Sequence, residues 1–123
     1  MLVPRPERLR VAARDVGDVD LCIERCAGPV RLHNIFLSDE TLRSFTLTRV
    51  VLGTLELPGH VVRALVSDGS IDTECLLTDE MRALLVAQPV NDRVAIAIRL
   101  RNADEVVRYA KIAAIVSLAT EPS

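Results

Sequence analysis

The sequence contains few aromatic residues, and this scarcity excludes one class of function. It has no tryptophan, one tyrosine and two phenylalanines. Proteins that hold single-stranded nucleic acid stack its bases on aromatic side chains, and this chain lacks such a platform. Basic residues are not in excess either, with 15 against 17 acidic ones, whereas nucleic-acid-binding domains gather positive charge on one face. We therefore expect no nucleic-acid partner.

Long apolar runs are also missing. No stretch approaches the ~18–20 residues of a membrane span, and residues 1–6 contain no apolar region of a signal peptide. These absences predict a cytoplasmic chain with no membrane partner. The three cysteines, Cys22, Cys26 and Cys75, are an odd number among apolar neighbours, which is typical of reduced thiols packed as small hydrophobic side chains.

Familiar catalytic motifs are absent from the sequence. It contains no Walker A pattern, no Gly-x-Gly-x-x-Gly and no Gly-x-Ser-x-Gly elbow. His33 and His60 lie far apart, and Cys22 and Cys26 do not have Cys-x-x-Cys spacing. A zinc site made by these two cysteines and one histidine is the alternative to free thiols. We predict a chain that is not an enzyme and that has no cofactor or metal.

What the sequence does contain is alternation. Half of its residues are hydrophobic, and 123 residues suit a single domain, 1–123, with one core. Val19, Leu21 and Ile23 alternate with polar residues, as in a strand with one buried face. Similar segments separated by turn residues predict a mostly β domain. The further strands expected are residues 9–14, 30–33, 50–57, 60–66, 71–77, 93–101 and 106–118.

Two short helices should interrupt these strands, and both begin in the same way. Ser38 and Thr78 each precede an Asp-Glu pair, at 39–40 and 79–80. The hydroxyl group can cap the first turn while the acids lie at the positive end of the helix dipole. Capping therefore explains these acids better than general acid–base catalysis, because no nucleophile or histidine accompanies them.

The second helix should place Met81, Leu84 and Leu85 on one face and end at or before Gln88, because the residue preceding Pro89 disfavours helix. The order strand, strand, short helix, strand then occurs twice, in residues 8–57 and 60–118. A ββαβ unit this short cannot cover its own apolar face. We therefore predict duplicated ββαβ units that interlock into one barrel.

This arrangement resembles a double-psi β-barrel. Residues 9–17, 28–33 and 108–115 are similar to strands of the first, N-terminal subdomain of the Cdc48/p97/VAT-type AAA ATPases. Residues 77–80 and 90–96 are similar to the second half of that subdomain. Asn91 stands where the family has the glycine of a Gly-Asp turn. Asparagine tolerates the left-handed conformation better than most residues, so the turn can be kept.

The resemblance implies a non-catalytic domain that binds a protein partner or substrate protein for an AAA ATPase module not in this chain. From the residues themselves, Arg99 and Arg101 share a strand face. With Arg108 across the turn they predict a small basic patch. That patch could meet an acidic partner protein or another subunit of a homo-oligomer.

A second resemblance leads to an alternative function. Arg31, His33 and Asn34, together with Thr78 and Asp79, are similar to motifs of small molybdate-binding and transporter-associated barrels. This resemblance implies an oligomeric β-barrel that binds a small ligand or oxyanion through those five residues.

Overall fold

The structure, a computed structural model, describes residues 6–65 and 78–119. Their strands are β1 (Glu7–Val11), β2 (Val16–Ile23), β3 (Val30–Leu37), β4 (Phe45–Leu52), β5 (Leu55–Glu56), β6 (Val86–Ala87), β7 (Val94–Asn102) and β8 (Arg108–Leu118). The helices are α1 (Asp39–Ser44), α2 (Gly59–Leu65) and α3 (Asp79–Leu84). None of the helices in these residues has the length and apolar character needed to cross a membrane. The prediction of a mostly β fold is confirmed.

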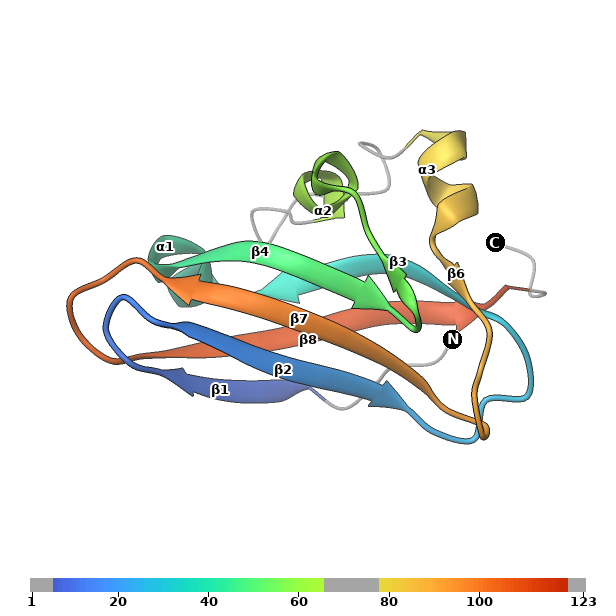
Figure 1. Ribbon diagram of the computed structural model, residues 1–123, viewed down its shortest axis with the longest axis horizontal. Helices are drawn as coiled ribbons and strands as arrows, with labels where there is room; N and C mark the ends of the chain where they lie inside the picture. The colour runs from blue at the N-terminus through green and yellow to red at the C-terminus, as the bar shows by residue number, and fades with distance from the viewer. Residues whose placement is uncertain (1–5, 66–77, 120–123) are drawn as a thin grey trace.

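The strands form two four-stranded antiparallel sheets in two layers (Figure 1). One sheet has the order β1-β8-β3-β6 and the other β2-β7-β4-β5. The connection between β7 and β8 passes from one sheet to the other, so two central strands, one of each layer, are consecutive in sequence. In the described residues the two sheets do not close into the barrel that was expected. Strands β5 and β6 lie at the same side of the two layers, but each is only two residues long and they do not pair with each other.

Alternation along β7 builds the core between the layers. Val94, Ile96 and Ile98 point inward and are at most 1% exposed. Ala95 on the opposite face is exposed. Burying each aliphatic side chain of this size contributes roughly 1.5–3 kcal/mol, so the central strand stabilises both layers.

The two open sides of the layers are covered differently. On one side β1 contacts β2, and Gly17 permits the close approach: a Cβ there would lie 2.7 Å from Leu9 Cδ2 and 2.8 Å from Val11 Cγ2. On the other side α2 contacts both β4 and β3, and its Val61 and Val62 are buried (Figure 1). A single core therefore extends from β1 to α2.

The strand predicted over residues 60–66 is wrong, since residues 59–65 form α2. Val61 and Val62 are both buried although they are adjacent, which a strand with one buried face does not allow. Their backbone N–H groups both donate to Pro58 O at 3.0 Å, so proline stands at the start of a helix rather than in a turn. Consequently the second half does not repeat the first in its order of elements.

Other strand boundaries also differ. The segment 50–57 is a hairpin, because Gly53 adopts φ +63° and Leu52 pairs with Leu55 across a two-residue loop. Strands β1, β2, β3, β7 and β8 all occur near their predicted positions. The strand predicted over residues 71–77 lies outside the described residues, as does Cys75.

Both predicted helix starts are present. Ser38 caps α1 by accepting a hydrogen bond from Thr41 N at 3.2 Å. The second predicted helix corresponds to α3, which ends at Leu84, before Gln88 as predicted. Its expected apolar face is wrong in one respect: Leu85 is buried, but Leu84 is 49% exposed.

The turn predicted from the resemblance at residues 91–92 is also observed. Asn91 and Asp92 have φ values of +52° and +62°, and Val90 pairs with Arg93 on either side. Two consecutive positive φ angles are typical of a type I′ turn, for which asparagine is a favoured residue. The conformational argument for Asn91 is therefore confirmed.

Candidate binding site

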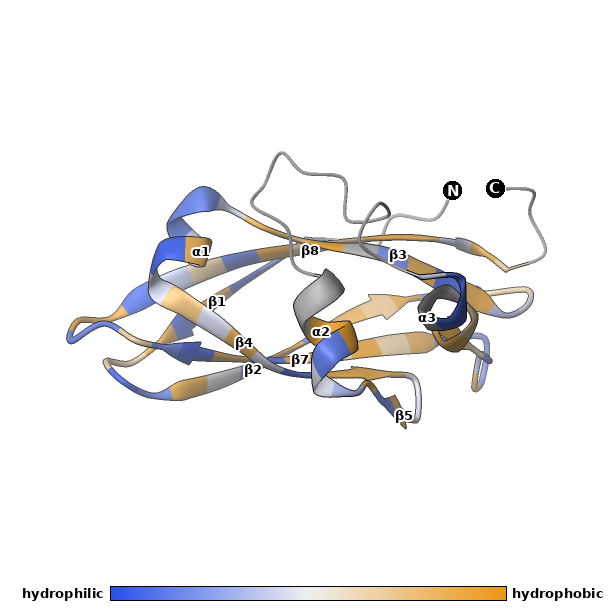
Figure 2. Cartoon of the chain, turned by 90° about the horizontal axis from the view of Figure 1, so that it is seen from above, coloured by the Kyte–Doolittle hydropathy of each residue, from blue (hydrophilic) through white to orange (hydrophobic). Residues whose placement is uncertain are grey.

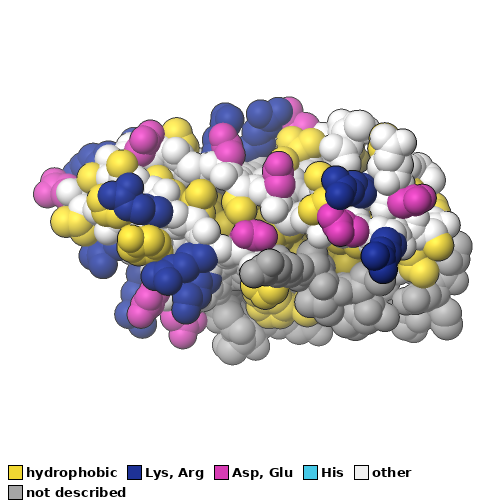
Figure 3. All heavy atoms as spheres, turned by 90° about the horizontal axis from the view of Figure 1, so that it is seen from below, with side chains coloured by type: hydrophobic (Ala, Val, Ile, Leu, Met, Phe, Trp, Pro, Cys, Tyr) yellow, Lys and Arg dark blue, Asp and Glu magenta, His cyan; other side chains and the backbone are white. Residues whose placement is uncertain are grey.

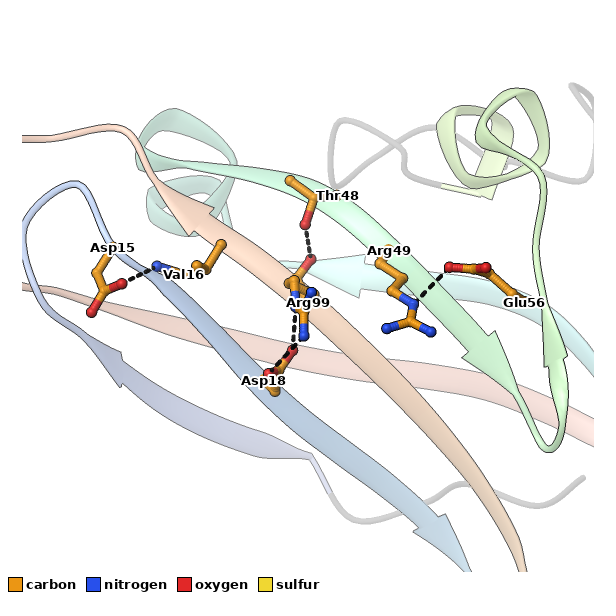
Figure 4. Close-up of polar contacts among 7 residues, drawn as sticks. All are labelled: Asp15, Val16, Asp18, Thr48, Arg49, Glu56 and Arg99. Carbon is orange, nitrogen blue, oxygen red and sulfur yellow. Dashed lines mark hydrogen bonds and ion pairs between the residues drawn. The ribbon is translucent and has the colours of Figure 1, made fainter.

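The three arginines of the predicted patch lie in two different sheets. Arg99 and Arg101 belong to β7, whereas Arg108 begins β8 in the other layer. Arg99 is already paired: its Nε donates to Asp18 Oδ1 at 2.8 Å and its Nη2 to Oδ2 at 3.3 Å (Figure 4). The hydrogen bond from Arg99 holds the pKa of the Asp18 carboxyl below its ordinary value of 3.8.

Further pairing neutralises the outer face of the β2-β7-β4-β5 sheet. Arg49, next to Arg99 in register, binds Glu56 Oε1 at 2.7 Å (Figure 4). The Thr48 hydroxyl donates to the Arg99 carbonyl at 3.2 Å. Arg101 is exposed at the end of the strand. On the face that carries Arg99, Arg99 and Arg49 are thus held in local ion pairs, whereas Arg101 has no carboxylate partner among the described residues.

The residues of the oxyanion alternative come from two elements. Strand β3 contains Arg31, His33 and Asn34, and its register with β8 shifts between Leu32 and Asn34. The side chains of Arg31 and His33 are half-buried. The Arg31 Nε atom is buried without a hydrogen-bond partner. Thr78 and Asp79 are exposed at the start of α3.

One contact of His33 was not anticipated from the sequence. Its Nε2 lies 2.7 Å from the Ser117 hydroxyl of β8. A serine and a histidine at this distance satisfy the first requirement of nucleophilic catalysis, which also needs oxyanion donors and a substrate cavity. The two residues sit next to each other across paired strands at the β3 irregularity, where a hydrogen bond between side chains is an ordinary structural contact.

The proposed metal ligands are not brought together. Within residues 6–65 and 78–119, no group of three or more His, Cys, Asp or Glu side chains converges. Cys26 is buried, and burial raises the pKa of its thiol. Cys22 is exposed, so the expectation that it packs as a small hydrophobic side chain is wrong.

A cavity of about 610 Å³ lies where α1 meets β1 and the start of β8. It combines three arginines, two acids, two apolar side chains and a serine. The lining residues are Arg8, Glu40, Arg43, Ser44, Asp104, Val107, Arg108 and Tyr109. Hydrophilic segments gather at this end of the molecule (Figure 2). Seen from below, Lys and Arg side chains gather with hydrophobic ones towards the same end (Figure 3). We call this site the arginine cavity.

Hydrogen bonds accepted by Thr41 and Ser44 hold α1 in place over the arginine cavity. Thr41 is fully buried, and its Oγ1 accepts a hydrogen bond from Lys111 N of β8 at 2.9 Å. The same atom lies 2.7 Å from the Ser38 hydroxyl. At the other end of the helix, Ala103 N donates to Ser44 O at 2.9 Å. The short helix is therefore tied to both β8 and the β7–β8 turn.

Asn102 fixes that turn. Its side chain is fully buried, and its Nδ2 donates to Val11 O at 3.2 Å, Ala12 O at 3.1 Å and Val106 O at 2.9 Å. Its Oδ1 accepts from Asp104 N at 2.9 Å. One amide thus joins the end of β1 to the loop that carries the cavity residues, so the wall of the cavity is preorganised.

The arginines of the cavity differ in their partners. Arg108 Nε donates to Asp104 Oδ2 at 2.9 Å. Arg8 instead lies over the ring of Tyr109. Among the described residues, neither Arg8 nor Arg43 has a carboxylate within ion-pair distance. Two guanidinium groups at the cavity are therefore available to a ligand.

Among the other described arginines, Arg10, Arg25, Arg31 and Arg101 also have no carboxylate within ion-pair distance, whereas four form pairs with acids at 2.7–3.0 Å. These pairs are Arg14–Glu105, Arg49–Glu56, Arg93–Glu24 and Arg99–Asp18. Basic charge also continues beside the cavity. Arg10 is exposed opposite Tyr109, and Lys111 is exposed opposite Arg8, in the β1–β8 ladder.

Sequence reasoning identified Arg108 but missed Arg8, Arg43 and Tyr109. The alternation of β1 was a usable signal, since it places Arg8 and Arg10 on one polar face. The convergence of β1, α1 and β8 had no signal in the sequence. No family model, curated protein or solved structure matches this chain.

Proposed function

We propose that this chain is a non-catalytic protein-binding domain whose partner contacts the arginine cavity. The observation that carries the proposal is that Arg8 and Arg43, which have no carboxylate partners among the described residues, lie together at a cavity of about 610 Å³ beside the Tyr109 ring. Arginine and tyrosine are enriched at protein interfaces and among the residues that dominate binding energy. The cavity contains both.

The composition of the arginine cavity favours binding over catalysis. Its lining includes no histidine or cysteine among the described residues, and Asp104 is already bound to Arg108. Glu40 is the remaining acid, and no activated nucleophile accompanies it. The resemblance to the AAA ATPase N-terminal subdomain implies the same class of function, in which the domain would present its partner to an ATPase module outside this chain.

Selection of peptides from a random display library on the purified protein tests the proposal without assuming the partner's chemistry. Arg43→Glu is the test variant, and Arg101→Glu is the matched control because it makes the same charge change at a residue of β7 that does not line the cavity. We expect selected peptides to bind the Arg43 variant roughly tenfold more weakly and the Arg101 variant about as well as the unchanged protein. Failure to enrich any peptide, or equal loss in both variants, would contradict the proposal.

The contact between His33 and Ser117 makes ester hydrolysis the relevant enzymatic control. We expect turnover of p-nitrophenyl acetate to equal that of the Ser117→Ala variant, and no labelling of Ser117 by a fluorophosphonate. Turnover or labelling that requires both residues would show that the domain is an enzyme instead.

The oxyanion alternative is favoured by one observation, the buried Arg31 Nε without a partner. A small-molecule ligand at about 100 times its dissociation constant would stabilise the fold by roughly 2.7 kcal/mol. We expect molybdate, tungstate and sulfate to leave the melting temperature unchanged. A saturable rise that is lost in Arg31→Gln would establish the oxyanion-binding barrel in place of our proposal.

A further inference from the structure

The arginine cavity has an apolar rim as well as a charged wall. Val106, Val107 and Tyr109 are 53%, 39% and 49% exposed. Large hydrophobic side chains grouped on a surface mark interaction sites more often than isolated ones do. All three lie within four consecutive residues at the end of the β7–β8 loop and the start of β8, and Val107 and Tyr109 line the same cavity as the arginines.

This rim is held rigidly next to the charges. Asn102 Nδ2 binds the Val106 carbonyl, and Asp104 accepts from Arg108 Nε. Tyr109 in turn carries the Arg8 guanidinium over its ring. A ligand would therefore meet cationic and apolar groups that are already positioned, and it would lose less free energy in ordering them.

We propose, on the basis of the protein-binding function inferred above, that the ligand is an acidic peptide segment with an apolar side chain next to its carboxylates. The guanidinium fork matches a carboxylate with two parallel hydrogen bonds. Arg8 and Arg43 are the groups available for such bonds, and Val107 with the Tyr109 ring is the surface available for the apolar side chain.

The acids of the cavity decide between a peptide and a compact oxyanion. Three arginines and two acids line it, which leaves a net charge of 3 − 2 = +1. A small multivalent anion would be repelled by Glu40 and Asp104 while it is attracted by the arginines. An extended segment can instead spread its carboxylates over Arg8, Arg43 and the adjoining Arg10 and Lys111.

Fluorescence anisotropy with labelled peptides of equal length tests this inference. One peptide is acidic and contains leucine, a second has serine in place of leucine, and a third has lysine in place of the acids. At constant ionic strength we expect the acidic leucine peptide to bind at least roughly tenfold more tightly than either of the others. Inorganic phosphate should displace it no better than chloride does.

Two variants separate the contribution of the arginine charge to peptide binding from that of the apolar surface. Arg43→Glu should weaken the acidic leucine and acidic serine peptides alike. Val107→Ser, an exposed position where the fold is not at risk, should weaken only the leucine peptide. Equal binding of the serine peptide, preference for the lysine peptide, or displacement by phosphate would each overturn the inference. If displayed peptides are selected through Arg43 but are not acidic, the inference fails while the protein-binding function stands. If no peptide is selected, that function fails.

Discussion

The guanidinium of Arg8 lies 4.4 Å from the centroid of the Tyr109 ring. The two residues come from neighbouring strands, and they are diagonal in register because Tyr109 faces Arg10 and Lys111 faces Arg8. An aromatic face positions the guanidinium by its quadrupole and does not neutralise the charge. This relationship explains how an arginine can be ordered at the cavity without a carboxylate partner.

A double-mutant cycle between these two residues should show their coupling. We expect Arg8→Met and Tyr109→Leu, measured by urea unfolding, to give an interaction free energy of about 0.5–1 kcal/mol, as for other exposed cation–π pairs. Tyr109→Phe keeps the aromatic face and should keep the coupling. A value of zero would show that the contact does not position Arg8.

Removing the Asn102 side chain should destabilise the domain strongly. Asn102→Ala leaves the carbonyls of Val11, Ala12 and Val106 without this donor, at a cost on the order of 3 kcal/mol in the free energy of unfolding. Asn91→Gly, in an exposed turn with positive φ, is the matched control and should change stability little. Equal effects of the two substitutions in urea unfolding would refute the role given to Asn102.

The core strand offers a second test of stability. Ile96 is fully buried between the sheets, so Ile96→Ala should cost about 2–5 kcal/mol through lost burial and the cavity left behind. Ala95→Ser lies on the exposed face of the same strand and should have almost no effect. A thermal melt in which Ile96→Ala shifts the midpoint by less than about a degree would contradict the assigned inward face.

Strands with one buried face could be predicted from the sequence, because alternation is a local property. This holds for β2 and β7, in which more buried residues alternate with more exposed ones along each strand. The helix at 59–65 was missed because the adjacent Val61 and Val62 favour strand by residue type. Their burial against two sheets at once decided the conformation.

The candidate binding site was only partly predictable, for a different reason. Arg8, Arg43 and Arg108 are 35 and 65 residues apart along the chain, and only the pairing of β1 with β8 and the docking of α1 bring them together. The predicted patch of Arg99, Arg101 and Arg108 assumed that charges near one turn share a face. The loop between β7 and β8 instead crosses from one sheet to the other, and Asp18 pairs with Arg99.

The pairing of Asp18 with Arg99 predicts a pH dependence of stability. The pKa of Asp18 is lower in the folded chain than its ordinary value of 3.8. The stabilisation is therefore fully present above about pH 5 and is lost as the pH falls through the folded-state pKa. Both side chains are exposed, so the effect should be small.

Urea unfolding at a series of pH values provides the measurement. The stability difference between the unchanged protein and Asp18→Asn should be constant near neutrality and should shrink in acid. Asp20→Asn, on the same exposed face of β2, is the matched control. A difference that grows as the pH falls would have the wrong sign for this ion pair.

The central claim is that a protein partner binds at the arginine cavity, and chemical-shift mapping by nuclear magnetic resonance tests it most directly. We predict that titration with the acidic leucine peptide shifts the backbone amides of residues 8–11, 40–44 and 104–109 in a saturable manner. The amides beside Asp18 and Arg99 on the other sheet should stay unchanged. Saturable shifts confined to that other sheet would contradict the claim, as would shifts that persist unaltered in Arg43→Glu.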